Sequence, residues 1–408
     1  MARSEFSRRI TDMPDATLQE SEEFPLFPAR MASAIHSGSD ISITPNLYGF
    51  IPFLRFIYRL GCLCGLLAIA ASLPILQWAS LGYLLDSASR MANGRPWREV
   101  VPGLALAGKI GWIAIAILVT WFPAFLSAQY AYQAELIEPG SNLAANWRIA
   151  ATIIGLAWII HVVWALIRGG RWRDFLWPAP IRFFREFFRP STWRRVEDHL
   201  WETVTGFHVP RLTWLGFRAW IGGIIWLAIP GVMIVTGMQA KNQPALAAVG
   251  VAGFFSMWWL LLYLPFLQVQ FARENSWRAL FRISTIRSDF RRAPWAFFFG
   301  LLATLGLAIP LFLLRIESPP KELLWIPCLF FVLLTLPAKL CVGWSLYRAS
   351  RRTLPRWLPS RYLAWILQIS IVPFYILFLY LGSIASWDGA LIVFLQHAFL
   401  TPVPFVGR

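Results

Sequence analysis

Eight long apolar runs dominate this chain and restrict it to one class of fold. Each run approaches the roughly 20 residues that an α-helix needs to cross a bilayer. We therefore expect an all-α fold, a polytopic membrane bundle of about eight transmembrane helices. The expected spans are Leu60–Leu85, Ala107–Ala128, Ile149–Ile167, Phe217–Met238, Ala245–Gln270, Pro294–Leu314, Leu323–Tyr347 and Tyr362–Ile384.

Prolines interrupt most of these runs near their middle. A proline removes one backbone donor and kinks the helix that contains it. Membrane helices tolerate this, since neighbouring helices satisfy the groups that are set free. In the first run, Pro74 leaves two possibilities open: residues 60–85 either cross the membrane or form a re-entrant hairpin. The interrupting residues are Pro74, Pro123, Pro230, Pro265, Pro310, Pro337 and Pro373.

The composition supports a membrane protein. The chain is 57% hydrophobic and only 14% charged, whereas soluble globular chains carry about 25% charged residues. Its 23 tryptophans fit a protein with long membrane–water boundaries, where tryptophan gathers. These values exclude an ordinary cytosolic enzyme and a largely disordered chain.

Basic residues alternate strongly between successive loops. The loops after the first, third, fifth and seventh runs hold nearly all the Lys and Arg of this part of the chain. Basic loops stay on the cytoplasmic side, so these loops should face the cytoplasm from the inner (plasma) membrane. Eight crossings would place both termini outside, whereas a re-entrant first segment would keep the amino-terminal tail inside.

Three regions are expected along the chain: a flexible polar tail over 1–47, a first transmembrane half over 48–238 and a second over 239–408. The halves share a short motif, Leu73-Pro74-Ile75-Leu76-Gln77 and Leu264-Pro265-Phe266-Leu267-Gln268. It suggests a parallel repeat of four plus four helices about an axis along the membrane normal. Chance similarity between proline-rich apolar segments is the alternative.

The same stretch also resembles a known family. The first motif is followed by Leu81-Gly82-Tyr83-Leu84-Leu85, Arg90, Gly94 and Gly103. In this pattern the chain is similar, mainly over residues 55–130, to bacterial multi-pass membrane proteins of the domain-of-unknown-function 4013 type. The resemblance implies a polytopic inner-membrane protein without an assigned activity, and it carries over no catalytic residues.

The basic loop over 168–216 alternates arginines with phenylalanine and tryptophan. This pattern suits short helices that lie in the headgroup plane, with Pro190 separating two of them within Ile181–Val204. Anionic phospholipids are the expected partners, and nucleic acid is not, since the flanking spans tether the loop to the bilayer. Ordinary cytoplasmic positive charge with aromatic anchors remains the simpler interpretation. The candidate headgroup contacts are Arg171, Arg173, Arg182, Arg185, Arg189, Arg194 and Arg195.

Four polar side chains lie within or beside the apolar runs and form a candidate intramembrane site. Ionisable residues inside spans are functional candidates by default. His161 and Lys339 occupy similar places in the proposed repeats, and Gln77 and Gln268 end the shared motif. The simpler interpretation is that Lys339 snorkels to the surface and that the others form interhelical hydrogen bonds.

No sequence motif indicates catalysis or a cofactor. Neither G-x-x-x-x-G-K-[ST] nor G-x-G-x-x-G occurs, and the pair Cys62 and Cys64 has no second pair of zinc ligands nearby. We expect a non-enzymatic integral membrane protein without cofactor or metal, acting as a scaffold, assembly or envelope-organising component, with a membrane-protein partner possible. The alternative is a transporter or channel for a small or amphiphilic solute; a lipid-modifying enzyme is the third possibility.

Overall fold

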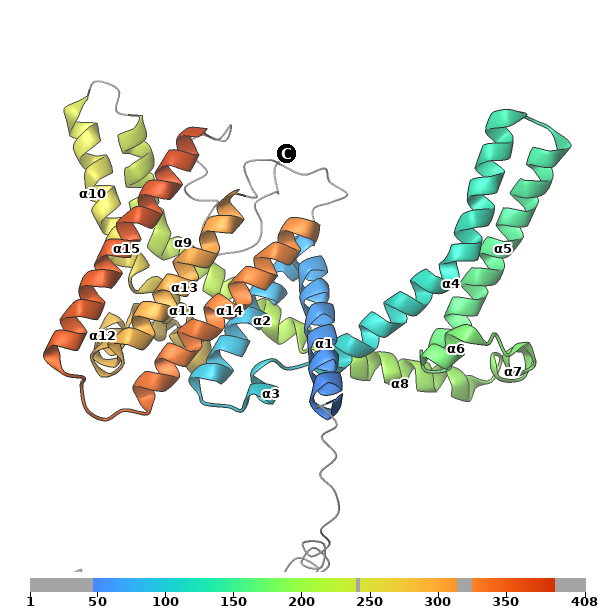
Figure 1. Cartoon of the computed structure of the whole chain (residues 1–408), viewed down its shortest axis with the longest axis horizontal. Coiled ribbons are helices and arrows are strands. Elements are labelled where there is room, and N and C mark those ends of the chain that lie inside the picture. The colour runs from blue at the N-terminus through green and yellow to red at the C-terminus, as the bar shows by residue number, and fades with distance from the viewer. Residues whose placement is uncertain (1–46, 240–242, 314–324, 386–408) are drawn as a thin grey trace, which may run out of the picture. The chain divides into compact units, whose positions relative to one another are not determined.

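The computed structural model describes residues 47–239, 243–313 and 325–385. Within these ranges every regular element is a helix and there is no strand, as expected (Figure 1). The polar tail before residue 47 lies outside the described residues. By its contacts the chain divides after Ile51, and the arrangement below concerns the unit that begins at Pro52.

Eight of the described helices are long and apolar enough to cross a membrane. Shorter helices join them. In chain order the elements are α1 (Leu47–Ser72), α2 (Leu76–Ala92), α3 (Trp97–Val100), α4 (Leu104–Ile137), α5 (Asn142–Ile167), α6 (Trp172–Leu176), α7 (Pro180–Glu186), α8 (Pro190–Gly206), α9 (Val209–Met238), α10 (Pro244–Leu261), α11 (Leu264–Glu274), η1 (Trp277–Phe281), α12 (Ile283–Arg292), α13 (Pro294–Leu313), α14 (Trp325–Ser350) and α15 (Leu358–Ala385).

Two expected spans, the first and the fifth, have wrong boundaries. The fifth, Ala245–Gln270, is divided, because α10 ends at Leu261 and α11 begins at Leu264 after a turn. Residues 60–85 are not one helix: α1 ends at Ser72, a turn holds Pro74, and α2 begins at Leu76. The span proper is Ile51–Ser72. The chain reverses at this turn, so α1 and α2 run in opposite directions (Figure 1). Leu63 and Leu67 of α1 belong to the same buried cluster as Tyr83 and Leu84 of α2, although α2 packs chiefly against α9 and α14. Pro74 promotes the turn, because it cannot continue the hydrogen bonds of α1.

Helix α2 lies at the centre of the bundle and is buried along most of its length. It packs against α9 and α14, and closely enough that glycine is required at the contacts. A Cβ added to Gly82 would lie 1.9 Å from the carbonyl oxygen of Leu212, and one added to Gly216 would lie 1.9 Å from that of Trp78. On the other side, a Cβ on Gly343 of α14 would lie 2.3 Å from the carbonyl oxygen of Ala88. Small residues bring membrane helices together in this way.

The two halves share an order of elements but differ in packing. In both, a spanning helix ends next to a proline and a shorter helix follows: α1 and α2 around Pro74, α10 and α11 around Pro265. In the second half α13 and α14 pack on each other and on α15, α2 and α11. In the first half α4 and α5 pack mainly on each other and on α6. Half of the most apolar window is buried in α13 and α14, against 11% in α4 and α5. The four-plus-four repeat therefore stays a prediction.

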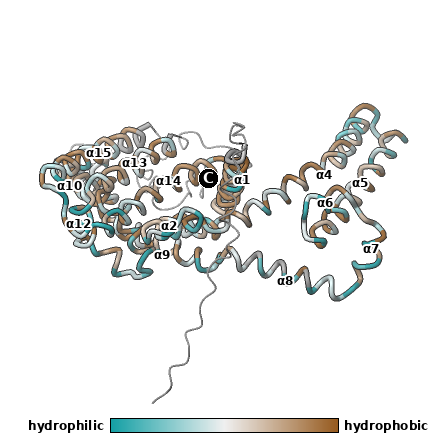
Figure 2. The backbone as a smooth tube through the Cα atoms, turned by 60° about the horizontal axis from the view of Figure 1, so that its bottom comes forward, coloured by the Kyte–Doolittle hydropathy of each residue, from teal (hydrophilic) through white to brown (hydrophobic). Residues whose placement is uncertain are grey.

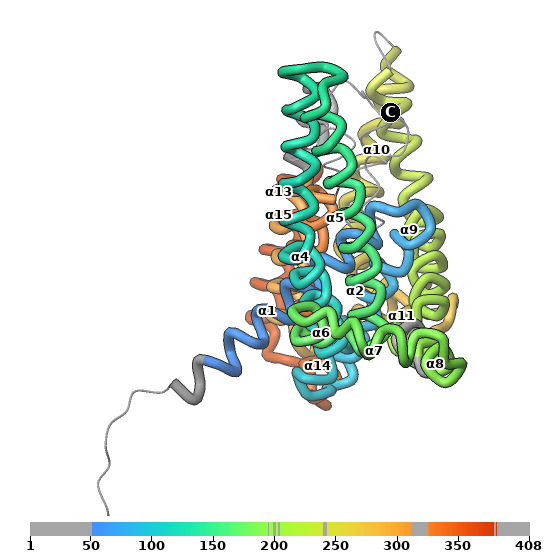
Figure 3. Tube along the Cα trace, turned by 90° about the vertical axis from the view of Figure 1, so that its right-hand side faces the viewer, coloured from blue at the N-terminus to red at the C-terminus, as the bar shows by residue number. Residues whose placement is uncertain are grey.

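The arginine-bearing connections gather at one end of the helices. Figure 1 shows α3, α6, α7, α8 and α12 at the same end. Figure 3 shows α6 to α8 at the carboxyl end of α5. Figure 2 shows hydrophilic residues on α12, among other segments. We refer to this end as the basic end of the bundle.

Candidate functional site

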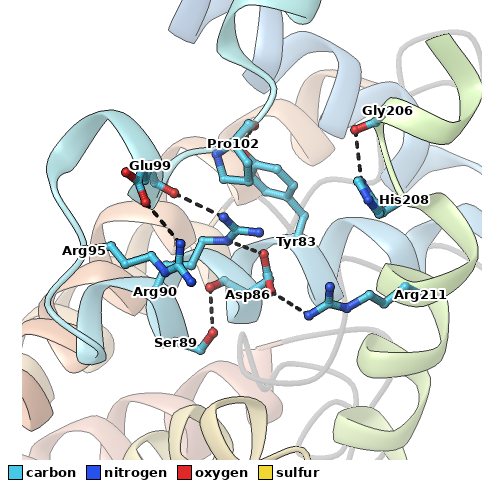
Figure 4. Close-up of polar contacts among 10 residues, drawn as sticks. All are labelled: Tyr83, Asp86, Ser89, Arg90, Arg95, Glu99, Pro102, Gly206, His208 and Arg211. Carbon is cyan, nitrogen blue, oxygen red and sulfur yellow. Dashed lines mark hydrogen bonds and ion pairs between the residues drawn. The ribbon is translucent and has the colours of Figure 1, made fainter. Parts of the chain in front are cut away.

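A buried carboxylate near the basic end organises a cluster of charged side chains (Figure 4). Asp86 of α2 is only 7% exposed. Its Oδ2 accepts a hydrogen bond from Nε of Arg90 at 2.7 Å, and its Oδ1 lies 4.0 Å from Nη2 of Arg211 on α9. Two cations from two helices thus surround a single carboxylate. Because a buried charge needs compensation, the two arginines offset the cost of placing this carboxylate in the bundle, and Arg211 links α9 to α2.

Further hydrogen bonds fix the segment that follows α2. Nη1 of Arg90 also reaches the carbonyl oxygen of Glu99, at 3.5 Å, while Arg95 and Glu99 pair through their side chains at 3.1 Å. The hydroxyl of Tyr83 donates to the carbonyl oxygen of Pro102 at 2.7 Å. The turn into α4 is therefore held against the end of α2 (Figure 4).

A cavity of about 270 Å³ opens beside this cluster. The wall of this cavity includes Asp86, Arg90, Arg211 and His208. His208, which precedes α9, has a left-handed backbone with φ of 50°. Sequence reasoning missed this cluster. The signal was present, because Asp86 follows directly on an apolar run where a carboxylate is costly, but Arg211 is far away in the chain.

Two members of the predicted intramembrane site come together. Nζ of Lys339 on α14 donates to Oε1 of Gln268 on α11 at 2.7 Å, and the two residues are 1% and 0% exposed. Lys339 therefore does not snorkel to the surface. It is a buried amine with an amide acceptor, in the core where α2, α11 and α14 meet.

The other two members lie elsewhere. Nε2 of His161 on α5 donates to the carbonyl oxygen of Phe175 on α6 at 2.7 Å, so it fastens the end of the α4–α5 hairpin. Gln77 is half-buried in the first turn of α2. None of the four residues lines the cavity next to Asp86. In this structure they do not form one site.

The basic loop contains the expected short helices, with Pro190 starting α8 after the end of α7. Large apolar side chains remain exposed on it: Ile181 by 84%, Phe184 by 72% and Phe188 by 76%. A second set faces inward, where Phe183 packs on Trp164 of α5, and Phe187 packs on Phe183. The region is thus attached to the hairpin by one face and leaves another apolar face open.

Most of the candidate headgroup arginines are exposed on the same helices. Arg171, Arg173, Arg182, Arg185, Arg189 and Arg194 are exposed, and the side chain of Arg195 lies outside the described residues. Arg168 has a different role. Its guanidinium bonds to the carbonyl oxygens of Asp174 and Trp177, and burial lowers its pKa while the Asp174 carboxylate opposes that shift.

Among the described residues, no group of three His, Cys, Asp or Glu side chains is placed to hold a metal ion. Comparisons with family models, with curated proteins and with solved structures find no match for the chain. The resemblance to the domain-of-unknown-function proteins thus gains no support and stays a prediction. What the geometry shows is a multi-pass membrane protein with a basic end, a buried lysine–glutamine pair and an open amphipathic surface.

Proposed function

We propose that this chain is a non-enzymatic protein of the inner (plasma) membrane, with its basic end in the cytoplasm, and that α6 to α8 bind the membrane surface through anionic phospholipids. On this proposal the protein is a scaffold or envelope-organising component. The gathering of the arginine-bearing connections at one end of the bundle supports the orientation.

One observation carries the proposal: exposed aromatic and exposed arginine side chains share α7 and the short connection from α7 to α8. Phe184 and Phe188 are about three-quarters exposed, and Arg182, Arg185 and Arg189 are exposed between and beside them. Burying a side chain of this size is worth about 1.5–3 kcal/mol. The protein itself does not bury these rings, so lipid supplies the apolar environment. Each arginine near an anionic surface adds about 1 kcal/mol.

A fluorescent probe on Phe184 tests this placement. In the full-length protein with its native cysteines replaced, a bimane label at Phe184→Cys should be quenched by brominated lipids in nanodiscs. Quenching should increase with the fraction of phosphatidylglycerol and decrease as salt rises. The same label at Glu197→Cys, on an exposed acidic position of α8, is the control and should stay unquenched. A Phe184 probe that brominated lipid does not quench would contradict the proposal.

The open α4–α5 hairpin supports a role in assembly. Its apolar windows are only 11% buried, although the corresponding α13 and α14 are half buried. Such a hairpin has room for another membrane protein along its length. Photo-crosslinking from Val119 and Ile153, which are 64% and 61% exposed, should yield protein adducts in native membranes; lipid adducts alone would remove this support.

The buried Lys339–Gln268 pair favours the second candidate, a transporter or channel. Intramembrane cations mark solute or proton pathways in many transporters. Reconstituted protein should then show solute flux that Lys339→Met abolishes, with Lys109→Met as a charge-matched control. The failure of His161 and Gln77 to join the pair weighs against this candidate.

A further inference from the structure

A second cavity, at the basic end of the other half, has an unusual lining. It occupies about 460 Å³ between α10, α12 and α15. Arg287 and Arg291 come from α12 and Arg361 from the first turn of α15, while Trp259 and Trp365 form part of the opposite wall. We refer to it as the α12 groove. It lies on different elements from α6 to α8, so it is independent of the function proposed above.

The charge of the α12 groove is uncompensated. No carboxylate lines it, nor the adjoining cavity of about 530 Å³ that shares Trp259, Arg287 and Arg291. Within the described part of the chain, none of the three arginines forms an ion pair; Arg287 has only a neutral partner, the hydroxyl of Tyr263, at 3.3 Å.

Neighbouring arginines on the same segment behave differently. Arg282 pairs with Glu274 at 2.9 Å and Arg292 pairs with Asp289 at 3.4 Å. Acidic partners are thus available next to the groove but are not used inside it. Three guanidinium groups around one cavity attract an anion, and phosphate matches their fork of donors well.

The groove changes from charged to apolar along α15. Gln368 lies seven residues after Arg361, about 10 Å further along the helix, and it also lines the groove. It is only 6% exposed, yet its amide forms no hydrogen bond within the described part of the chain. Beside it, Trp365 and Leu262 contribute apolar surface. An occupant should therefore combine an anionic head, a hydrogen-bonding middle and an apolar tail.

Hydrogen bonds outside the cavity hold its walls in place. Nε1 of Trp258 donates to the carbonyl oxygen of Ile369 at 3.0 Å, which joins α10 to α15. The backbone N–H of Arg356 donates to the carbonyl oxygen of Arg291 at 2.9 Å, which joins the loop before α15 to α12. A site that exists before binding loses little entropy when it is occupied.

We propose that the α12 groove binds one anionic phospholipid. The lipid phosphate contacts Arg287, Arg291 and Arg361, the ester oxygens accept a hydrogen bond from Gln368, and the acyl chains lie along Trp365 and Trp259. Inorganic phosphate shares the chemistry of the head but has no tail, so it would use the arginines alone.

Native mass spectrometry of the full-length protein in detergent with added phosphatidylglycerol tests the proposal. The wild type should retain one tightly bound lipid. The variant Arg287→Gln/Arg291→Gln/Arg361→Gln should lower its occupancy by about tenfold or more, since each arginine contributes near an anionic group. The matched control, Arg98→Gln/Arg278→Gln/Arg351→Gln, removes three exposed arginines outside the groove and should retain the lipid. Equal occupancy in the two triple variants would overturn the proposal.

Two further experiments distinguish recognition of the lipid phosphate from recognition of the rest of the lipid. Gln368→Leu should weaken phosphatidylglycerol binding without affecting the fold, checked by an unchanged elution volume. An excess of inorganic phosphate should not displace the lipid, because the acyl chains hold it. Displacement of the lipid by phosphate would show that the groove recognises an anion only and would refute a lipid site. Unchanged phosphatidylglycerol binding by Gln368→Leu would overturn the contact between the ester oxygens and Gln368.

Discussion

At the scale of single residues, Lys339 is an ionisable side chain buried in the core of the bundle. A cation in a membrane core requires a partner, and the oxygen of Gln268 provides one at 2.7 Å. Replacing both members of such a pair by apolar groups of similar shape can be nearly neutral, whereas removing one costs the remaining buried group one of its hydrogen bonds. The pair is therefore best studied by changing each member alone and both together.

We expect Gln268→Leu to destabilise the protein by about 1.5–3 kcal/mol, since the Lys339 amine loses this acceptor. Lys339→Met should cost less, about 0.5–1.5 kcal/mol, because only a neutral amide loses one donor. The double variant should be more stable than Gln268→Leu alone. Thermal unfolding of the full-length protein in micelles, followed by size-exclusion chromatography, measures all three; strictly additive effects would contradict a direct pairing.

Asp86 and Glu99 provide a contrast between a buried and an exposed carboxylate on one segment. The Asp86 side chain is 11% exposed and that of Glu99 is 53% exposed. Asp86→Ala should destabilise the fold by about 1–3 kcal/mol, since Arg90 loses its nearest acceptor. Glu99→Gln should change stability by less than about 1 kcal/mol, as exposed ion pairs contribute little. Thermal unfolding measures the stability of both variants. Comparable losses of stability would show that burial of the carboxylate does not determine its contribution.

At the scale of elements, the contact between α2 and α9 depends on two glycines. Gly82 and Gly216 each face a backbone carbonyl that an added Cβ would approach to 1.9 Å. A backbone carbonyl in a packed helix cannot move aside as a flexible side chain can. Alanine at either glycine would therefore force α2 and α9 apart.

Gly82→Ala should accordingly lower the unfolding temperature and reduce the yield of folded protein. Gly155→Ala is the matched control: it lies within α5, and an added Cβ there meets nothing within 4 Å. The control should be neutral or slightly stabilising, because alanine favours a helix by about 1 kcal/mol over glycine. A Gly82→Ala variant as stable as the control would mean that α2 and α9 pack less closely than the structure shows.

At the scale of the whole molecule, the hairpin of α1 and α2 decides the topology. We predict that the chain crosses the bilayer along Ile51–Ser72 and that α2 returns it to the basic end, where α3 lies. The turn at Pro74 should then lie on the side opposite the basic end.

Cysteine accessibility tests this arrangement. In a chain without native cysteines, Ile75→Cys and Gln243→Cys should react with an impermeant maleimide from one side, and Ser288→Cys from the other. Ile75 is 68% exposed, whereas a single crossing over 60–85 would bury position 75 in the middle of the bilayer, where such a reagent does not reach. If Ile75→Cys does not react, the prediction is wrong and residues 60–85 form a single crossing.

Much of the fold could be predicted from the sequence, for a physical reason. A bilayer requires long apolar helices whose backbone groups are bonded internally, so length and hydropathy suffice to find six of the spans, each with at least one end within a few residues of its observed position. The two helices on either side of Pro190 are likewise visible, because a proline starts a helix well and continues one badly. These features depend on local sequence alone.

The tertiary structure alone decided which distant residues meet. Lys339 and Gln268 are 71 residues apart, and Asp86 meets Arg211 only because two glycines let α2 and α9 touch. Hydropathy cannot distinguish the packed hairpin of α13 and α14 from the open one of α4 and α5, because apolar surface satisfies lipid and protein neighbours alike. Thus the sequence by itself determined the class, the spans and the basic end, whereas packing decided the hairpin, the buried pair and the α12 groove.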